Sequence, residues 1–209
     1  IYFDGELQLP TLEVPTYLAA IYLSLRLYER RSVSAAALAG IAWGVAALVR
    51  PNVLIFVPLV AVWLVWTVRP RSARALAPTA IFVLAIAASI LPITIYNWTV
   101  GGDRVLISSQ AGVNLWIGNN PQSDGSTAIV PGTRPDWWGG YYDAIQQAEV
   151  AEGRALKPSE VSRHYTQRAL HFLRDSPGHA FQLWLWKLRL FWTNYELGNN
   201  ADERFFAYR

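Results

Sequence analysis

The sequence predicts an all-α, polytopic membrane bundle followed by a mainly α-helical, loop-rich extracytoplasmic segment. No acidic residue occurs between Arg31 and Asp103, and long apolar runs fill that interval with arginines at their ends. Hydrophobic residues make up 53% and charged residues 16% of the chain, which favours a membrane protein over a soluble globule. The residues after about Thr99 are more polar, and they resemble an ordinary water-exposed segment.

Four apolar runs are expected to be membrane-spanning helices, and together they make residues 1–97 a transmembrane bundle. Each run is long enough for a hydrocarbon core of roughly 30 Å. The first differs from the others because it contains Glu13 near its outer end, while the second contains the small-residue pair Gly40 and Gly44. The runs lie at residues 12–27, 33–49, 53–68 and 75–96.

Arginine positions set the expected topology. Short loops rich in Lys and Arg tend to stay in the cytoplasm. Three arginines lie at residues 26–31, around the end of the first run, and three more lie at residues 69–74, whereas Arg50 stands alone in the junction between them. We therefore expect a multi-pass protein of a cell inner membrane, with residues 98–179 outside the cytoplasm. Proline residues within the third and fourth runs are expected to kink their helices.

The outer segment at residues 98–179 is expected to contain turns and two helices. Gly, Pro, Asn and Asp are frequent in its first half, where residues 104–108 form a short β-like stretch. Helices are expected at 141–155 and 159–174, the second with Ser159 as its N-cap and a Ser-Pro-Gly stop after it.

Residues 180–209 are expected to begin with an aromatic helix at the membrane surface and to lead into the next membrane region. Large apolar side chains recur there at helical intervals, while Lys187 and Arg189 interrupt a clean span. The alternative is the mouth of a further span. The chain contains no methionine, begins at Ile1 and ends without a closing structural signal, so we expect an internal piece of a longer protein.

Composition excludes several kinds of site. The absence of cysteine excludes disulfides, cysteine-ligated zinc and thiol catalysis. His164 and His171 lie seven residues apart without a carboxylate at ligand spacing, so no metal site is predicted. Arginine is abundant, but no basic helix or aromatic RNA-binding motif accompanies it, and no nucleic-acid partner is expected.

A few charged residues are candidates for function, each with a plainer alternative. Glu13 lies just inside a predicted span, where an ionisable group is functional or solvated at headgroup level. Arg50 offers forked donors that match phosphate oxygens, or it ends a helix and reaches the interface. Lys187 could bind lipid phosphate or anchor its helix. Glu196 could contact a polar substrate or cap a turn.

Three stretches, at residues 38–58, 91–121 and 169–200, resemble in this order the middle of integral-membrane glycosyltransferases of family 39. These belong to the GT-C superfamily and include relatives of protein O-mannosyltransferases and lipid A aminoarabinose transferases. The resemblance implies a polyprenyl-phosphate-linked sugar as donor, a protein, lipid or glycan acceptor outside the cytoplasm, and membrane lipids as surroundings. No cofactor is required by it, although a divalent cation is compatible with the leaving phosphate.

The resemblance also implies roles for single residues. Arg50 and Lys187 would bind the lipid phosphate of the donor. The family residues around the substrate are matched by Asn97, Asn119, Asn120 and Glu196. Glu13 is added as a substrate-binding candidate because it is an ionisable residue inside a predicted span, not because of the resemblance. In the family an arginine usually precedes the asparagine that Asn97 matches, and here Tyr96 takes its place. The catalytic carboxylate is expected upstream of this piece.

Non-enzymatic functions stay open beside the enzyme. A transporter or assembly subunit could use the outer segment as a binding module, and a receptor-like domain could be anchored by the helices. An outer loop with paired acidic residues upstream would favour the enzyme, whereas a repeated half would favour a transporter.

Overall fold

A computed structural model describes residues 9–68 and 76–193, and the regular elements within these ranges are all helices, without a β-strand. The predicted all-α class is therefore confirmed. The chain divides into two compact units, Ile1–Ser108 and Ser109–Arg209. The first unit includes residues 98–108, which the sequence analysis placed with the outer segment.

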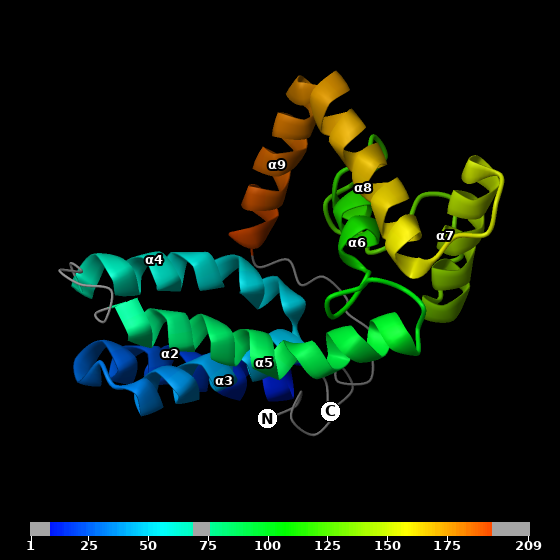
Figure 1. The fold of residues 1–209 in the computed structure, drawn as a ribbon. Coiled ribbons are helices and arrows are strands. Elements are labelled where there is room, and N and C mark those ends of the chain that lie inside the picture. Colours follow the sequence, from blue (N-terminus) through cyan, green and yellow to red (C-terminus); the bar gives the residue numbers. More distant parts are fainter. Residues whose placement is uncertain (1–8, 69–75, 194–209) are drawn as a thin grey trace, which may run out of the picture. The chain divides into compact units, whose positions relative to one another are not determined.

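Within residues 9–68 and 76–108, the first unit is a helical bundle, with α3 packed against both α2 and α5 (Figure 1). The elements are α2 (Leu9–Arg30), α3 (Val33–Val49), η1 (Pro51–Phe56), α4 (Val57–Val68) and α5 (Ala77–Thr99). They overlap the four predicted runs, and α3 matches its run at both ends.

The third run departs from prediction because it is not one kinked helix. Its first part is the 3₁₀ helix η1, and the α-helix begins only at Val57, next to Pro58. Proline has no N–H to donate, so it fits the first turn of an α-helix, where that donor would be unpaired anyway. The proline therefore starts α4 instead of bending it.

Small side chains fill much of the buried surface of α3, and two glycines lie in the seam between α3 and α5. Ala36, Ala39, Ala46 and Ala47 are fully buried, and Gly40 and Gly44 lie against α5. A Cβ atom on Gly40 would overlap the backbone of Phe82. The predicted close approach of a neighbouring helix at this glycine pair is thus confirmed.

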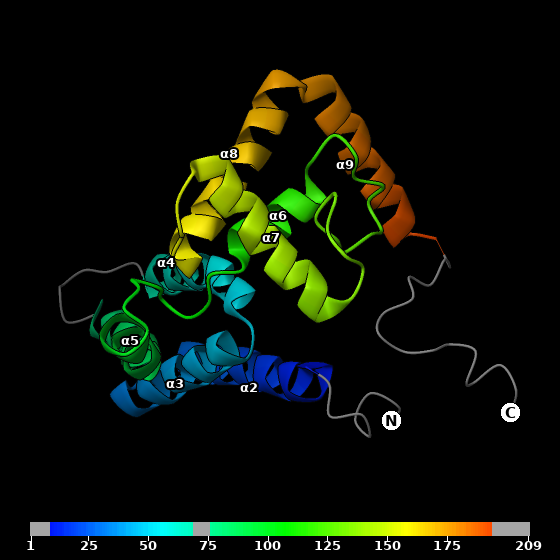
Figure 2. The same ribbon diagram turned by 90° about the vertical axis from the view of Figure 1, so that its right-hand side faces the viewer.

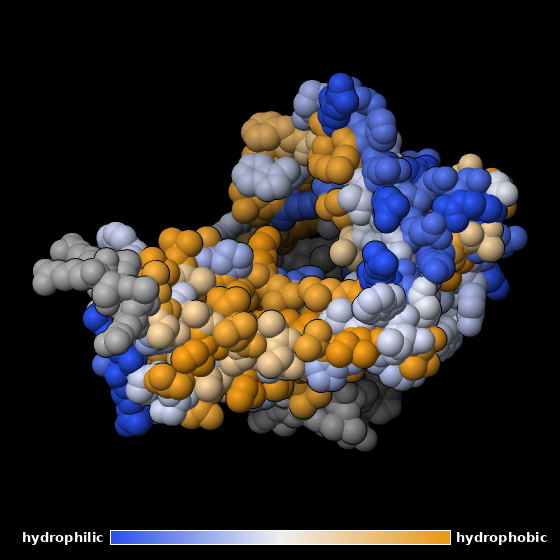
Figure 3. Space-filling model, in the orientation of Figure 1, coloured by the Kyte–Doolittle hydropathy of each residue, from blue (hydrophilic) through white to orange (hydrophobic). Residues whose placement is uncertain are grey.

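Large apolar side chains point outward from the first unit. Ile55 and Trp66 are each 73% exposed, and Leu18, Leu59, Val62 and Leu84 are exposed to a similar extent. Figure 3 shows apolar side chains gathered over α4 and α5. Among the described residues, α5 is the helix whose length and apolar composition suffice to cross a membrane, and shorter apolar helices lie at Val33–Val49 and Pro51–Thr67. The multi-pass arrangement stays a prediction.

Within residues 109–193, the second unit packs its helices around a core of its own. They are α6 (Ala111–Gly118), α7 (Trp137–Glu152), α8 (Pro158–Asp175) and α9 (Pro177–Phe191). Tyr165 of α8 is fully buried, and its hydroxyl donates to the carbonyl of Ala144 in α7 at 2.8 Å. A Cβ on Gly112 of α6 would overlap the backbone of Ser162 in α8. Helices α8 and α9 meet at an angle at the predicted Ser-Pro-Gly stop (Figure 2).

Helix starts in the second unit differ from the predicted ones. Helix α7 begins at Trp137, because the Asp136 carboxylate caps it by accepting from the N–H of Gly139 at 2.7 Å. Helix α8 has Lys157, not Ser159, as its N-cap residue, since Pro158 occupies the first helical position. The carboxylate of Glu160 accepts from the Lys157 N–H at 2.8 Å and completes this start.

The predicted β-like stretch at residues 104–108 is not a strand. Its carbonyls accept hydrogen bonds from side chains of α5 instead of from a partner strand. Asn97 Nδ2 donates to Val105 O at 3.1 Å and to Ile107 O at 3.3 Å, and Thr94 Oγ1 donates to Leu106 O at 2.8 Å. These bonds hold the chain against the last turns of α5.

Candidate functional site

Two predicted site residues, Glu13 and Arg50, meet in the first unit. Arg50 Nη1 lies 2.9 Å from Glu13 Oε2, and the two side chains are 49% and 16% exposed. Helices α2 and α3 are joined by a two-residue turn at 31–32, so residues near the start of α2 lie beside the end of α3. The ion pair closes that end of the bundle.

The backbone directs Arg50 away from its helix. Pro51 disfavours a helical conformation for the residue before it, and Arg50 is extended, with φ −147° and ψ 106°. Its N–H still donates to Ala46 O at 2.9 Å, while its carbonyl accepts from Val53 N at 3.2 Å. The residue therefore stands between two helices, with its side chain free to turn toward α2.

The ion pair leaves much of the guanidinium available. A guanidinium has five N–H donors, and only Nη1 bonds Glu13. The phenol of Tyr17, one helical turn beyond Glu13, lies within electrostatic range of both charges. An anion approaching the half-exposed Arg50 side chain would find spare donors beside a guanidinium that Glu13 holds in place.

Asn97 acts on the backbone in this structure. Its amide nitrogen donates hydrogen bonds to the carbonyls of Val105 and Ile107. The side chain thereby fixes the segment that leaves α5, and its carbonyl oxygen is the atom left for any substrate.

Lys187 holds α9 against the end of α6. Its ammonium donates to the carbonyl of Gly118, the last residue of α6, and burial lowers the pKa of Lys187. A cation at a helix C-terminus also interacts favourably with the helix dipole. Gly118 is the hydrogen-bond partner that the described residues give this ammonium, which has three hydrogens to donate.

Asn119 and Asn120 complete the same helix end. Asn119 Nδ2 donates to Leu115 O at 2.9 Å, and the buried Asn120 amide donates to Trp116 O and Ile117 O. The Oδ1 of Asn120 accepts from the N–H of Gln122 at 2.8 Å. The Gly-Asn-Asn motif is therefore the C-terminal cap of α6, a helix that the sequence analysis took for a loop.

The two predicted phosphate-binding cations lie in different units. Arg50 belongs to the first unit and Lys187 to the second, so their convergence on one phosphate stays a prediction. Glu196 lies outside the described residues. Within residues 9–68 and 76–193, no cluster of three or more His, Asp or Glu side chains is found that could hold a metal ion. His164 instead bonds Glu152 at 2.8 Å.

Sequence reasoning missed the partners of both cations. Glu13 and Arg50 were chosen separately, and nothing local pairs residues so far apart. Helical spacing would have helped, because two antiparallel helices of known length place their distant ends together. The carbonyl of Gly118, which receives Lys187, has no signature in sequence.

No family model, curated protein or solved structure matches the chain. The assignment to a glycosyltransferase family therefore rests on the resemblance alone.

Proposed function

We propose that the chain is part of a multi-pass inner-membrane glycosyltransferase that moves a sugar from a polyprenyl-phosphate donor to an extracytoplasmic acceptor. The observation that supports this best is the Arg50–Glu13 pair. A half-exposed guanidinium with spare donors stands at the end of an apolar helix, in a unit whose outer surface is apolar. Such a position suits the phosphate of a lipid whose chain lies in the bilayer.

The apolar exterior of the first unit supports a membrane environment for all of its helices. Large side chains such as Leu59 and Trp66 are exposed, whereas alanine and glycine make up much of the buried face of α3. Membrane helices pack through small residues because lipid already solvates large apolar ones. In this proposal residues 98–179 lie outside the cytoplasm, and the four apolar runs each cross the bilayer.

Arg50 would act on the leaving group. In an inverting transfer, a carboxylate takes the proton of the acceptor hydroxyl as its oxygen attacks the anomeric carbon, and the bond to the phosphate oxygen breaks. The phosphate gains negative charge in that step. A guanidinium with two parallel donors stabilises this charge most where water is scarce. Glu13 would hold Arg50 in position, and Lys187 would supply the second cation.

The experiment is sugar transfer from a synthetic polyprenyl-phosphate donor by the full-length protein that contains this sequence. Replacing Arg50 by Ala is expected to lower kcat by about a hundredfold or more, since loss of one charge-stabilising donor costs on the order of 10²–10³. Arg50→Lys keeps the charge but loses the fork, so it should recover only part of the rate.

A matched control is Arg104→Ala, which removes an exposed arginine of the same unit that lies over the ring of Trp98. It should leave transfer unchanged. Wild-type turnover by a correctly folded Arg50→Ala protein would reduce Arg50 to a helix-end anchor, and no transfer by the wild-type protein from any polyprenyl-phosphate sugar would reject the enzyme.

A further inference from the structure

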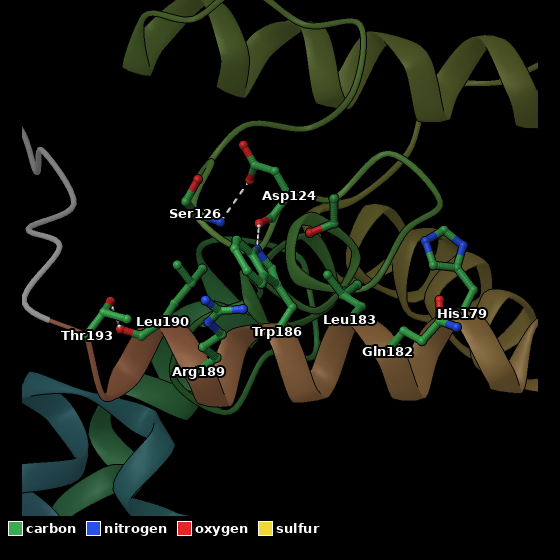
Figure 4. A pocket seen from close by; sticks show the side chains of 10 residues that line it. Asp124, Ser126, His179, Gln182, Leu183, Trp186, Arg189, Leu190 and Thr193 are labelled. Carbon is green, nitrogen blue, oxygen red and sulfur yellow. Dashed lines mark hydrogen bonds between the residues drawn. The ribbon is translucent and has the colours of Figure 1, made fainter.

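The second unit contains an open hollow of ≈ 690 Å³ between α9 and the loop at residues 123–126. Figure 4 shows its two walls: Trp186 and Arg189 rise from α9, and Asp124 and Ser126 face them from the loop. A hollow of this size falls in the range of small-molecule sites. None of the residues assigned above to the donor phosphate lines it.

The walls are held at a fixed spacing. Trp186 Nε1 donates to the carbonyl of Asp124 at 2.8 Å, which fixes the indole ring against the loop. Gly125 has a φ of +79°, and a Cβ atom there would lie 3.1 Å from Lys187 Cγ and 3.2 Å from Trp186 Cδ1. Glycine thus meets both the backbone and the space requirement. The hollow is formed before any ligand arrives.

Among the lining residues that the structure describes, the carboxylate is that of Asp124, and it is already hydrogen-bonded. Its oxygens accept from the N–H groups of Ser126 and Thr127 and from the hydroxyl of Thr127, at 2.6 to 2.8 Å. These bonds hold the pKa of Asp124 well below its usual range. The carboxylate therefore shapes the loop and remains ionised.

Arg189, by contrast, has no carboxylate partner among the residues that the structure describes. It is exposed, and its guanidinium lies 5.6 Å from the ring centroid of Trp186. An aromatic ring beside a spare cation offers an apolar face and an anion contact next to each other. Neutral hydrogen-bonding side chains, those of Ser123, Gln182 and Thr193, also line the hollow, together with His179 and the apolar Leu183 and Leu190.

We propose that this hollow binds an anionic saccharide, a sugar ring that carries a carboxylate or phosphate. The C–H face of the ring would lie on the Trp186 indole, the hydroxyls would bond Gln182 and Ser123, and the acidic group would bind Arg189. The fixed walls limit the ordering that binding would cost. The inference does not depend on glycosyl transfer; if the proposed function holds, the ligand is part of the acceptor.

The test is calorimetric titration of the full-length protein, purified in detergent, without donor. The probe is tetragalacturonate, and the matched neutral probe is the same tetrasaccharide with its carboxyl groups reduced. The acidic probe should bind about tenfold more tightly, because a charge-assisted hydrogen bond is worth about twice a neutral one. Arg189→Gln should remove that preference. Arg163→Gln, at an exposed arginine of α8 outside the hollow, should retain it.

Two further variants test the lining and separate this proposal from the proposed function. Gln182→Ala removes an exposed hydrogen-bonding side chain of the lining and should weaken both probes about threefold. Arg50→Ala should bind the acidic probe normally even if it loses transfer, which separates this proposal from the proposed function. Equal affinity for the two probes, an unchanged preference in folded Arg189→Gln, or tighter binding of inorganic phosphate or uridine monophosphate than of tetragalacturonate would overturn the assignment.

Discussion

The two units differ in the side chains that fill their interiors and cover their surfaces. In the first, fully buried Ala36 and Ala39 lie in the interior beside larger groups such as Phe82, while Ile55 and Trp66 lie on the surface at 73% exposure. In the second, Tyr165 and Phe172 form the interior, and arginines such as Arg134 and Arg154 lie outside, together with exposed apolar side chains such as Phe191. Water drives large apolar groups inward, whereas lipid does not. We therefore expect the first unit to lie in lipid and the second unit in water or at the membrane surface.

Polar contacts follow the same division. Helices of the second unit are stabilised by ion pairs and caps, such as the forked Arg134–Asp143 pair with contacts of 2.8 and 2.9 Å. The first unit has the Glu13–Arg50 pair at one end of its bundle and the buried contact from Trp43 Nε1 to Ser24 Oγ at 2.8 Å, while α4 and α5 contain no charged residue. If the solvents of the two units differ, the changes described next should affect the units differently.

The largest expected effect is the all-or-none response to an impermeant thiol reagent. Because the sequence has no cysteine, single cysteines at Ser72 and Ser126 report without background. In intact cells Ser126→Cys should be labelled and Ser72→Cys protected, since the arginines at 69–74 are expected to remain in the cytoplasm. Permeabilised cells provide the control, in which both should react. The reverse pattern in intact cells would reject the proposed topology.

The next largest effect concerns the tight glycines. Gly112→Ala is expected to destabilise the second unit by about 3 kcal/mol, since the new methyl group meets the backbone of Ser162 and the helices must separate. Gly40→Ala should act likewise between α3 and α5. Thermal unfolding with hydrogen exchange resolves which unit loosens. Gly178→Ala, with no atom near its Cβ position, is the control and should be neutral; an equal loss there would contradict the packing argument.

A smaller effect compares one buried hydrogen bond in each unit. Tyr165→Phe removes the bond to Ala144 O and should cost about 1–1.5 kcal/mol, because a buried hydrogen bond is lost in a core whose unfolded state is hydrated. Ser24→Ala removes the acceptor of Trp43 Nε1 with little change in volume, and it should cost only about 0.6 kcal/mol if the unfolded reference state lies in lipid. Both free energies can be taken from hydrogen exchange. Equal costs would argue that the two units share one solvent.

The smallest expected effect is a loss of folding stability at acid pH, confined to the second unit. Donation from Arg154 and from the Lys157 backbone lowers the pKa of Glu160 to about 2, against an ordinary 4.5. The unfolded chain therefore binds this proton first, and the stabilisation is present above about pH 4.5 and disappears as the pH falls toward 2. Stability measured from pH 6 to 2 should fall less steeply in Glu160→Gln. Glu29→Gln, on α2, should leave the slope unchanged; a slope unaltered by Glu160→Gln would show that the contact is inactive in solution.

Local signals explain how much of the fold was predictable. Helix α3 spans the expected 33–49 because Ser32 caps its start, by accepting from Ala35 N at 3.2 Å, and Pro51 follows its end. Helix α6 was missed because its glycines and asparagine favour turns, and only packing of Gly112 on α8 makes a helix there. The third run, which forms η1 and α4, shows that the sequence gives the position of a proline. Whether the proline kinks a helix or starts one depends on the neighbouring turn.

The candidate site was less predictable than the fold. Arg50 was found from residue type and position, but its contact with Glu13 joins residues 37 apart and depends on how α2 and α3 pack. Lys187 was expected to face a phosphate, and the structure adds a carbonyl partner that no side-chain pattern encodes. Helix spacing can place residues on faces, but tertiary packing decides which faces meet.

The seam between α3 and α5 has a consequence for how this sequence can drift over generations. At Gly40 and Gly44 the limit is volume, so neutral change is confined to the smallest residues. On the outward faces, at positions such as Leu59 and Val62, the limit is charge, and leucine, isoleucine, valine and phenylalanine are interchangeable. Relatives of this chain should therefore keep the small residues of the seam while their exteriors diverge freely. The glycines and alanines of α3 should then identify a relative better than its large exposed side chains do.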